Sequence, residues 1–87
     1  MVRMFARHKV ADYDAWRKVY DAFDRESLGV RAHAVYRDLT DPNDVTVWHD
    51  FDDQQSAESF AGSERLKEVM AEAGVVSAPN IWVTSES

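Results

Sequence analysis

One stretch in the middle of the chain decides the fold: residues 30–51 read VRAHAVYRDLTDPNDVTVWHDF. Two runs rich in β-branched and aromatic residues, 30–39 and 45–51, flank the segment Thr40-Asp41-Pro42-Asn43. Proline presets the backbone for a turn, and the short side chains of Asp and Asn hydrogen-bond to it. The stretch therefore predicts two antiparallel strands joined by a hairpin.

The length of the hairpin loop sets the register of the two strands. If residues 40–43 form the loop, Asp44 lies opposite Leu39 across the ladder. We expect one face to be mostly apolar and to lie beneath helices, and the other to bring opposite charges together. The first face carries Tyr36–Val47, Ala34–His49 and Ala32–Phe51, and the second carries Arg37–Thr46, Val35–Trp48, His33–Asp50 and Arg31–Asp52.

The segment before the hairpin predicts a strand followed by a helix. Residues 2–10 mix β-branched, aromatic and charged residues in near alternation, which is typical of a strand. Asp12 or Asp14 can then cap a helix that begins near Tyr13 and ends at Leu28-Gly29. The apolar positions of this helix, at three- and four-residue spacing, are Trp16, Val19, Tyr20 and Phe23.

The residues after the hairpin predict a second helix and a last strand. Asp53 or Ser56 can cap the helix, Gly74 ends it, and Gly62-Ser63 can break it in two. Residues 75–83 then return as a strand that contains proline, which favours an edge position. The order βαββαβ predicts an α+β, ferredoxin-like fold in one domain over residues 1–87: a four-stranded antiparallel sheet with two helices on one face.

The two faces of this sheet are expected to differ. Small residues under bulky helix side chains leave open whether the layer between sheet and helices is full or holds a pocket. The other face carries aromatic residues among charges, more than plain exposure to water favours. We therefore predict a homodimer in which two sheets pack face to face. The aromatic and aliphatic residues of that face are Phe5, Val35, Trp48 and Trp82.

Charge and composition exclude several classes of function. Ten Lys and Arg against 16 Asp and Glu give a net charge of −6, which argues against nucleic acid and against an anionic membrane surface as partners. The chain has no cysteine, and therefore no thiol nucleophile or thiolate metal ligand. It also shows no targeting segment and no apolar run long enough to span a membrane. We expect a cytoplasmic protein.

Two histidines are the candidate catalytic residues. We expect the first and third strands to lie side by side and to run parallel, which would make His8 and His49 neighbours beneath the helices. Such a pair titrates near neutral pH and suits a general base acting on an acidic C–H or phenol O–H. The alternative is that each imidazole only hydrogen-bonds a nearby backbone group. A metal site needs a third ligand that the sequence does not supply, so we predict neither metal nor cofactor.

The candidate substrate-binding residues are aromatic: Trp16, Tyr20, Tyr36 and Phe60. They can stack on a small hydrophobic molecule, and the two tyrosines can also donate hydrogen bonds to it. The alternative is that aromatic side chains at this spacing only fill the core. His33 opposite Asp50 resembles an acid–base dyad, but we interpret it as an ion pair on the dimer face.

The chain resembles the dimeric α+β barrel superfamily, and within it the antibiotic-biosynthesis-monooxygenase-like domains and related cyclase-like proteins. The resemblance spans nearly the whole chain. It implies a ligand pocket in each subunit between its own sheet and helices. The residues that carry it are Arg7 to Trp16, Tyr36-Arg37, Asp41-Pro42-Asn43 before Val45-Thr46-Val47, Phe51-Asp52-Asp53, Ala57, Phe60, Met70 and Ala73-Gly74-Val75.

The resemblance also implies an activity: oxygenation of a small aromatic or polyketide-like substrate without metal or flavin, through a substrate carbanion that reacts with dioxygen. Such oxygenases tend to use an Asn, a Trp and an Arg or His in the pocket. Trp48 and Asn80 are present, but the predicted register places Trp48 on the dimer face. Haem-degrading relatives use a His on the second helix, which this chain lacks. A non-oxidative cyclase or isomerase and a non-catalytic small-ligand-binding dimer remain open alternatives.

Overall fold

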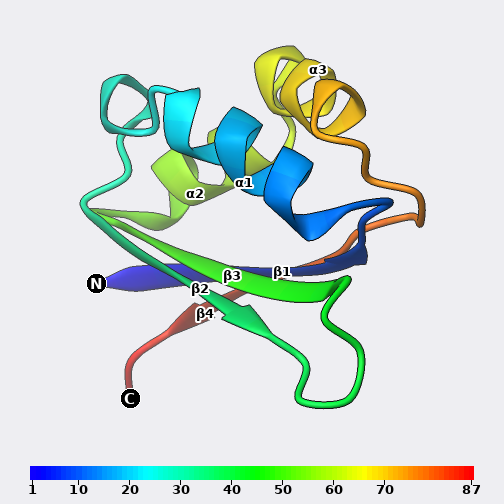
Figure 1. The fold of residues 1–87 in the computed structure, drawn as a ribbon. Helices are drawn as coiled ribbons and strands as arrows, with labels where there is room; N and C mark the ends of the chain where they lie inside the picture. The colour runs from blue at the N-terminus through cyan, green and yellow to red at the C-terminus, as the bar shows by residue number, and fades with distance from the viewer.

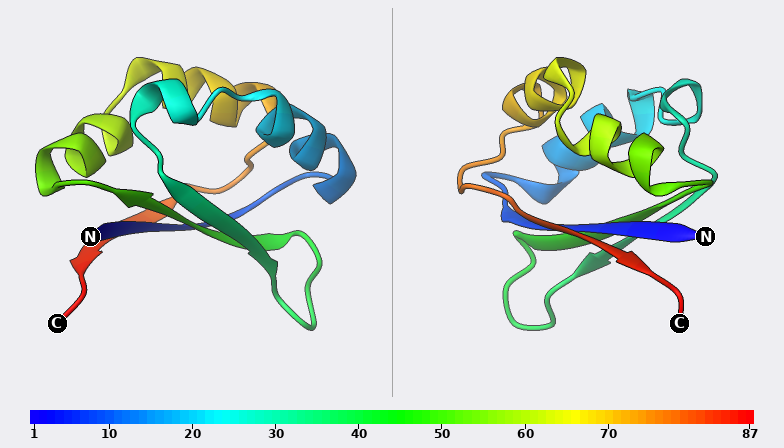
Figure 2. Two further views of the ribbon diagram at one scale, coloured as in Figure 1. Left: turned by 90° about the vertical axis from the view of Figure 1, so that its left-hand side faces the viewer. Right: turned by 180° about the vertical axis from the view of Figure 1, so that it is seen from behind.

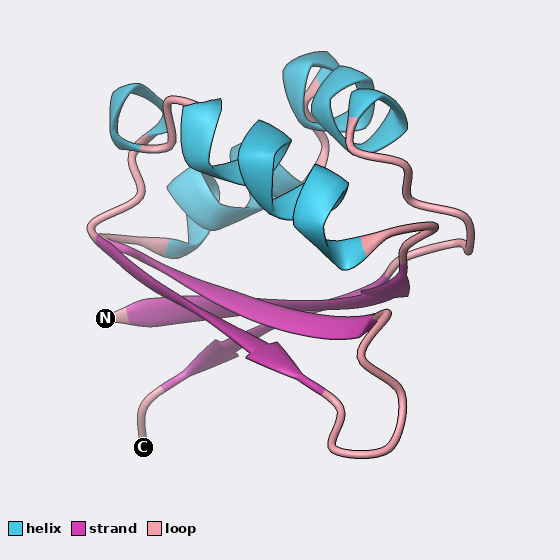
Figure 3. Ribbon diagram, in the orientation of Figure 1, coloured by secondary structure: helices cyan, strands magenta, loops and turns pink.

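The computed structural model describes residues 1–87 and contains a four-stranded antiparallel sheet covered on one face by three α-helices (Figures 1 and 3). This confirms the ferredoxin-like α+β prediction. The strands lie in the order β2-β3-β1-β4. The elements are β1 (Val2–Lys9), α1 (Tyr13–Ala22), the 3₁₀ helix η1 (Glu26–Leu28), β2 (Ala32–Arg37), β3 (Asp44–Phe51), α2 (Gln54–Ala61), α3 (Glu64–Glu72) and β4 (Asn80–Ser85).

Polar side chains fix where the helices begin. Asp12, Asp53 and Ser63 each accept a hydrogen bond from the amide three residues later, which satisfies one of the free N–H groups of a first turn. The Ser63 cap begins a new helix, so the predicted second helix is divided at Gly62-Ser63. Gly74 follows α3 with φ of +79°, a left-handed conformation that glycine adopts without strain.

The first helix is shorter than predicted. It ends at Ala22, and Phe23 is extended with ψ of 125°, whereas the prediction continued the helix to Leu28. Asp24 accepts a hydrogen bond from the amide of Ser27 and so begins the separate turn η1. Gly29, with φ of +93°, ends that turn. The side chain of Asp24 thus bonds to the local backbone in a conformation that interrupts the predicted helix.

The register of the hairpin differs from the prediction by one residue. In the structure Val35 lies opposite Val47, His33 opposite His49 and Ala34 opposite Trp48. The predicted pairs of Ala34 with His49, His33 with Asp50 and Val35 with Trp48 are therefore wrong. A shift of one residue moves every β2 side chain to the other face, because side chains alternate along a strand.

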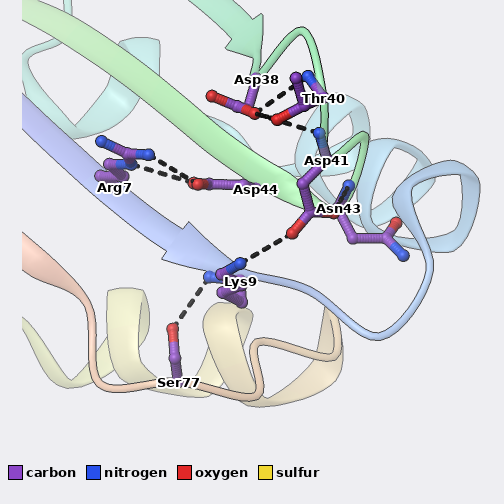
Figure 4. Close-up of polar contacts among 8 residues, drawn as sticks. All are labelled: Arg7, Lys9, Asp38, Thr40, Asp41, Asn43, Asp44 and Ser77. Carbon is purple, nitrogen blue, oxygen red and sulfur yellow. Dashed lines mark hydrogen bonds and ion pairs between the residues drawn. The ribbon is translucent and has the colours of Figure 1, made fainter.

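The hairpin loop explains this register, because it begins earlier than predicted. The carboxylate of Asp38 accepts hydrogen bonds from both the amide and the hydroxyl of Thr40 and from the amide of Asp41 (Figure 4). Asp41 in turn accepts from the ammonium of Lys9 at 2.7 Å. Asp38 therefore belongs to the turn, and the last β2 pair is Arg37 with Val45.

The direction of the two central strands corrects a second prediction. Strands β1 and β3 are neighbours, as expected, but they run antiparallel. His8 therefore lies opposite Val45, and His49 lies opposite Met4. The two histidines are separated by four residues along the ladder, about 13 Å at the rise of an extended strand. The prediction that they are direct neighbours was wrong. In an antiparallel pair residue numbers rise along one strand and fall along the other, so a residue near the end of β1 lies opposite one near the start of β3.

The core lies between the sheet and the helices, and the opposite face of the sheet is open (Figure 2). The side chains of Met4, Ala6 and His8 point to the helices and are buried, which confirms the predicted face of β1. None of the helices has the length and apolar character that a membrane crossing requires.

Candidate active site

A small, mostly enclosed space remains between the sheet and the helices. Its volume is about 40 Å³, and its lining is almost wholly apolar. That is room for about one or two water-sized molecules and well below the several hundred Å³ of an ordinary ligand pocket. The sheet contributes Met4, Ala6, His8, Val47, His49 and Ile81, and the helices contribute Trp16, Tyr20, Phe60, Leu66, Val69, Met70 and Ala73, with Phe23 at the end of α1.

His8 enters this cavity without a partner. Its side chain is buried, and neither ring nitrogen has a hydrogen-bond partner in the protein. Burial lowers the pKa of His8, so the imidazole is neutral near pH 7. A buried polar group without a partner costs stability and is uncommon, and a water-sized molecule in this space could supply the missing hydrogen bond.

His49 lines the cavity as well, and it belongs to a chain of hydrogen bonds. The hydroxyl of Tyr20 lies 2.9 Å from Nε2 of His49 and 3.1 Å from Nδ1 of His33. Nδ1 of His49 is buried and has no partner. We call His33, Tyr20 and His49 the His–Tyr–His chain. It runs from an exposed imidazole on β2 through a helix tyrosine to a buried imidazole on β3.

Burial and one nearby cation set the charges of this chain. Burial is the main cause that lowers the pKa of His49 to about 4 and raises the pKa of Tyr20 to about 12. The pKa of His33 is also lowered, first by desolvation and then by the guanidinium of Arg25. All three groups are therefore neutral near pH 7. Arg25 lies over the Tyr20 ring, with its central carbon 4.2 Å from the ring centre.

The structure brings together most of the predicted site residues. Trp16, Tyr20 and Phe60 line the cavity with the two histidines, although His8 and His49 reach it from different rungs of the ladder. Tyr36 does not. It lies on the opposite face of the sheet and is 56% exposed, because the register shift turns it away from the helices. Its predicted place in the pocket was therefore wrong.

The sequence interpretation missed the role of His33 as a partner of Tyr20. The predicted register placed His33 on the open face, whereas the true register places it opposite His49 beneath α1. A signal was present in the sequence: Asp38 followed by Thr40 and Asp41 is typical of a turn in which the Asp side chain bonds to the following backbone. A loop that begins at Asp38 places His33 correctly.

The open face of the sheet holds paired charges and aromatic rings. Asp50 accepts two hydrogen bonds from Arg3, and Asp44 accepts two from Arg7, which holds the pKa of both carboxyls below their usual range. Beside them Phe5 and Trp82 stack at 5.3 Å. The guanidinium of Arg3 also lies over the Trp48 ring, 3.7 Å from its centre.

A metal site is not formed by these side chains. No group of three or more His, Asp or Glu residues is arranged to hold a metal ion. His8 and His49 lie on different rungs, and the acidic side chains of Asp44 and Asp50 are engaged with arginines on the other face.

Comparison with known proteins identifies the fold of this chain through solved structures and not through similar sequences. No family model matches the chain, and no curated protein has a significantly similar sequence. Among solved structures, SnoaB, a cofactor-independent oxygenase from Streptomyces nogalater, superposes with a TM-score of 0.75 and 13% identity, over 98% of this chain and 91% of that chain. A putative antibiotic biosynthesis monooxygenase from Caulobacter crescentus has a TM-score of 0.76 and 18% identity, over 99% and 89%.

A conserved protein from Methanosarcina mazei is similar to the same degree, with a TM-score of 0.76 and 18% identity over 99% of this chain and 92% of that chain. At identities this low the structural similarity establishes a shared fold only, and any activity has to be argued from the residues of the site. The resemblance found in the sequence is thereby confirmed at the level of structure: this chain has the fold of the antibiotic biosynthesis monooxygenase-like proteins.

Proposed function

We propose that the chain is a cofactor-independent oxygenase that acts on a small aromatic or polyketide-like molecule between its sheet and helices. One observation carries the proposal: an apolar cavity, on a monooxygenase-like fold, that is lined by two buried histidines whose rings include nitrogens without a partner in the protein. An apolar enclosure with a few convergent polar groups is the usual form of a small-molecule site.

The proposed reaction needs only the substrate, dioxygen and proton transfer. A neutral imidazole removes a proton from an acidic CH₂ group, and the resulting carbanion supplies electrons to dioxygen. One oxygen atom becomes a carbonyl on the substrate carbon, and the other leaves as water, so the CH₂ group is oxidised and dioxygen is reduced. His8 and His49 are the proposed proton-transfer residues because both are neutral and border the cavity, with His8 as the base and His49 as the proton donor.

The cavity must enlarge before such a substrate enters. Helix α3 supplies Leu66, Val69 and Met70 to its lining, and Gly62-Ser63 separates this helix from α2. Backbone hydrogen bonds of Gly74 with Ala11 and of Val76 with Lys9 hold the C-terminal end of α3 to β1, so the opening we propose is a movement of its N-terminal end. Trp16, Tyr20 and Phe60 would then contact the substrate as aromatic walls.

The small size of the cavity favours a second candidate, a non-catalytic dimer that binds a small ligand. In this case the orphaned imidazoles only hydrogen-bond the ligand. Both candidates use a homodimer, which is supported by the aromatic residues on the open face: Trp82 is 40% exposed, and Tyr36 is the most exposed ring of that face. Burying these rings against a second copy removes apolar surface from water.

Oxygen uptake separates the candidates. The purified chain is incubated with polycyclic phenols that carry an acidic CH₂ group, without added flavin or metal, and oxygen consumption and ¹⁸O incorporation are measured. We expect uptake with one labelled oxygen in the product. His8→Gln and His49→Gln should each lower turnover by about 10²–10⁴-fold. Tyr13→Phe, which alters a phenol on the same helix as Tyr20 but outside the cavity lining, is the control.

Each outcome assigns one function. Product without oxygen uptake indicates a cyclase or isomerase. Saturable binding without product indicates the ligand-binding dimer. Turnover that is unchanged in both histidine variants would refute the proposed proton-transfer roles.

A further inference from the structure

The His–Tyr–His chain has a direction that its geometry fixes. The hydroxyl of Tyr20 lies within hydrogen-bond distance of two ring nitrogens, but a phenol carries a single proton. It can donate to one imidazole only, and the other imidazole must donate to its oxygen. The open question is which histidine donates.

The contact between Arg25 and His33, at the solvent-exposed end of the His–Tyr–His chain, decides which histidine donates. Its Nη2 lies 3.4 Å from Nε2 of His33, and a guanidinium can only donate hydrogen bonds. Nε2 of His33 is therefore the acceptor, and a neutral His33 carries its proton on Nδ1, the atom that faces Tyr20.

The remaining links follow in order. His33 donates from Nδ1 to the Tyr20 oxygen, so the Tyr20 hydroxyl donates to Nε2 of His49. Because Nε2 accepts, the proton of a neutral His49 is on Nδ1. That Nδ1 is the buried nitrogen for which the protein supplies no partner. Arg25 is held for this role by the backbone carbonyl of Tyr20, to which its Nη1 donates.

We propose that the His–Tyr–His chain, polarised by Arg25, holds His49 as its Nδ1–H tautomer, so that the buried ring nitrogen without a protein partner is a hydrogen-bond donor. The group it takes is an oxygen acceptor on the bound molecule, a carbonyl or the oxyanion formed from it. The exposed end, His33, borders a surface hollow of about 420 Å³ that is open to solvent. The choice of ligand group rests on the proposed function; the tautomer does not.

The chain also delivers a proton when an oxyanion forms. The N–H bond at Nδ1 of His49 breaks, and an O–H bond forms on the ligand. The Tyr20 proton moves to Nε2 of His49, and the Nδ1 proton of His33 moves to the Tyr20 oxygen. A hydronium ion from solvent then protonates Nε2 of His33. One proton has passed from solvent to the ligand, and every group is again neutral, but both histidines now carry their proton on Nε2. Nε2–H of His33 then faces Arg25, which can only donate, so both tautomers must return before a second proton is delivered.

The test reads the ring protons directly and requires no substrate. The full chain is labelled with ¹⁵N-histidine, and the proton positions on each ring are measured by long-range ¹H–¹⁵N NMR at pH 7. We expect His49 to carry its proton on Nδ1 and to have an unprotonated Nε2. In Tyr20→Phe, Nε2 of His49 loses its donor, and the two tautomers should become mixed. Arg25→Gln should shift His33 toward its Nε2–H tautomer, and Tyr13→Phe should change neither ring.

Two results would overturn the proposal: a wild-type His49 with its proton on Nε2, or a His49 tautomer that is unchanged in Tyr20→Phe. The wild-type spectrum decides alone if a variant does not fold. Failure of the proposed function is distinguishable from failure of this proposal. A protein that shows the expected His49 tautomer but no oxygen uptake would contradict the oxygenase function and leave the tautomer assignment intact.

Discussion

Acid should destabilise this fold in a pH range that His49 sets. Burial lowers its pKa from 6.5 to about 4 in the folded chain. Between these values the unfolded chain binds a proton that the folded chain does not, so stability falls as the pH falls and is fully present above about 6.5. A tenfold change in proton affinity is worth about 1.4 kcal/mol, so His49 should account for a loss of about 3 kcal/mol between pH 7 and pH 4.

The assay compares urea unfolding of the wild-type chain and of His49→Gln at several pH values. We expect the difference between their free energies of unfolding to decrease by about 3 kcal/mol from pH 7 to pH 4. His8 and the paired carboxylates also titrate, but they are present in both chains and cancel in the difference. His33→Gln is the matched control, because His33 is exposed and should give a much smaller change. Parallel curves for wild type and His49→Gln would refute the reasoning.

Three further perturbations test the packing. Gly74→Ala should lower stability by about 1–2 kcal/mol because φ is positive there, whereas Gly62→Ala should cost little; equal losses in thermal unfolding would contradict this. Phe60→Ala should cost about 3–5 kcal/mol in urea unfolding, because it leaves a void beside the cavity, and a loss below about 1 kcal/mol would mean that α2 collapses onto the sheet. Trp82→Glu should convert the proposed dimer to monomer in sedimentation velocity while Arg65→Glu, on a helix, should not; a monomeric wild-type chain would count against the dimer.

The identity and order of the elements could be predicted because their signals are local. Helical spacing of apolar residues, the caps at Asp12 and Asp53 and the stop at Gly74 act within a few residues of sequence. The alternation of Met4, Ala6 and His8 likewise identified the buried face of β1. The aromatic walls of the cavity followed from the same spacing.

The direction of β1 against β3, which separates His8 from His49, could not be predicted this way, because it depends on contacts between distant parts of the chain. The hairpin register follows the turn at Asp38, a local signal that the predicted loop at residues 40–43 began too late to include. A slip of one residue exchanges the two faces of β2 and therefore decides whether His33 meets Tyr20.

The sequence by itself thus determined which segments form helices and strands, and which residues of the first strand face the core. Only the tertiary structure decided that Tyr20 links His49 to His33, and that His8 lies four residues further along the sheet without a hydrogen-bond partner. Backbone preferences and caps act over one or two turns, whereas strand direction and register are settled by the packing and hydrogen bonds of the whole sheet.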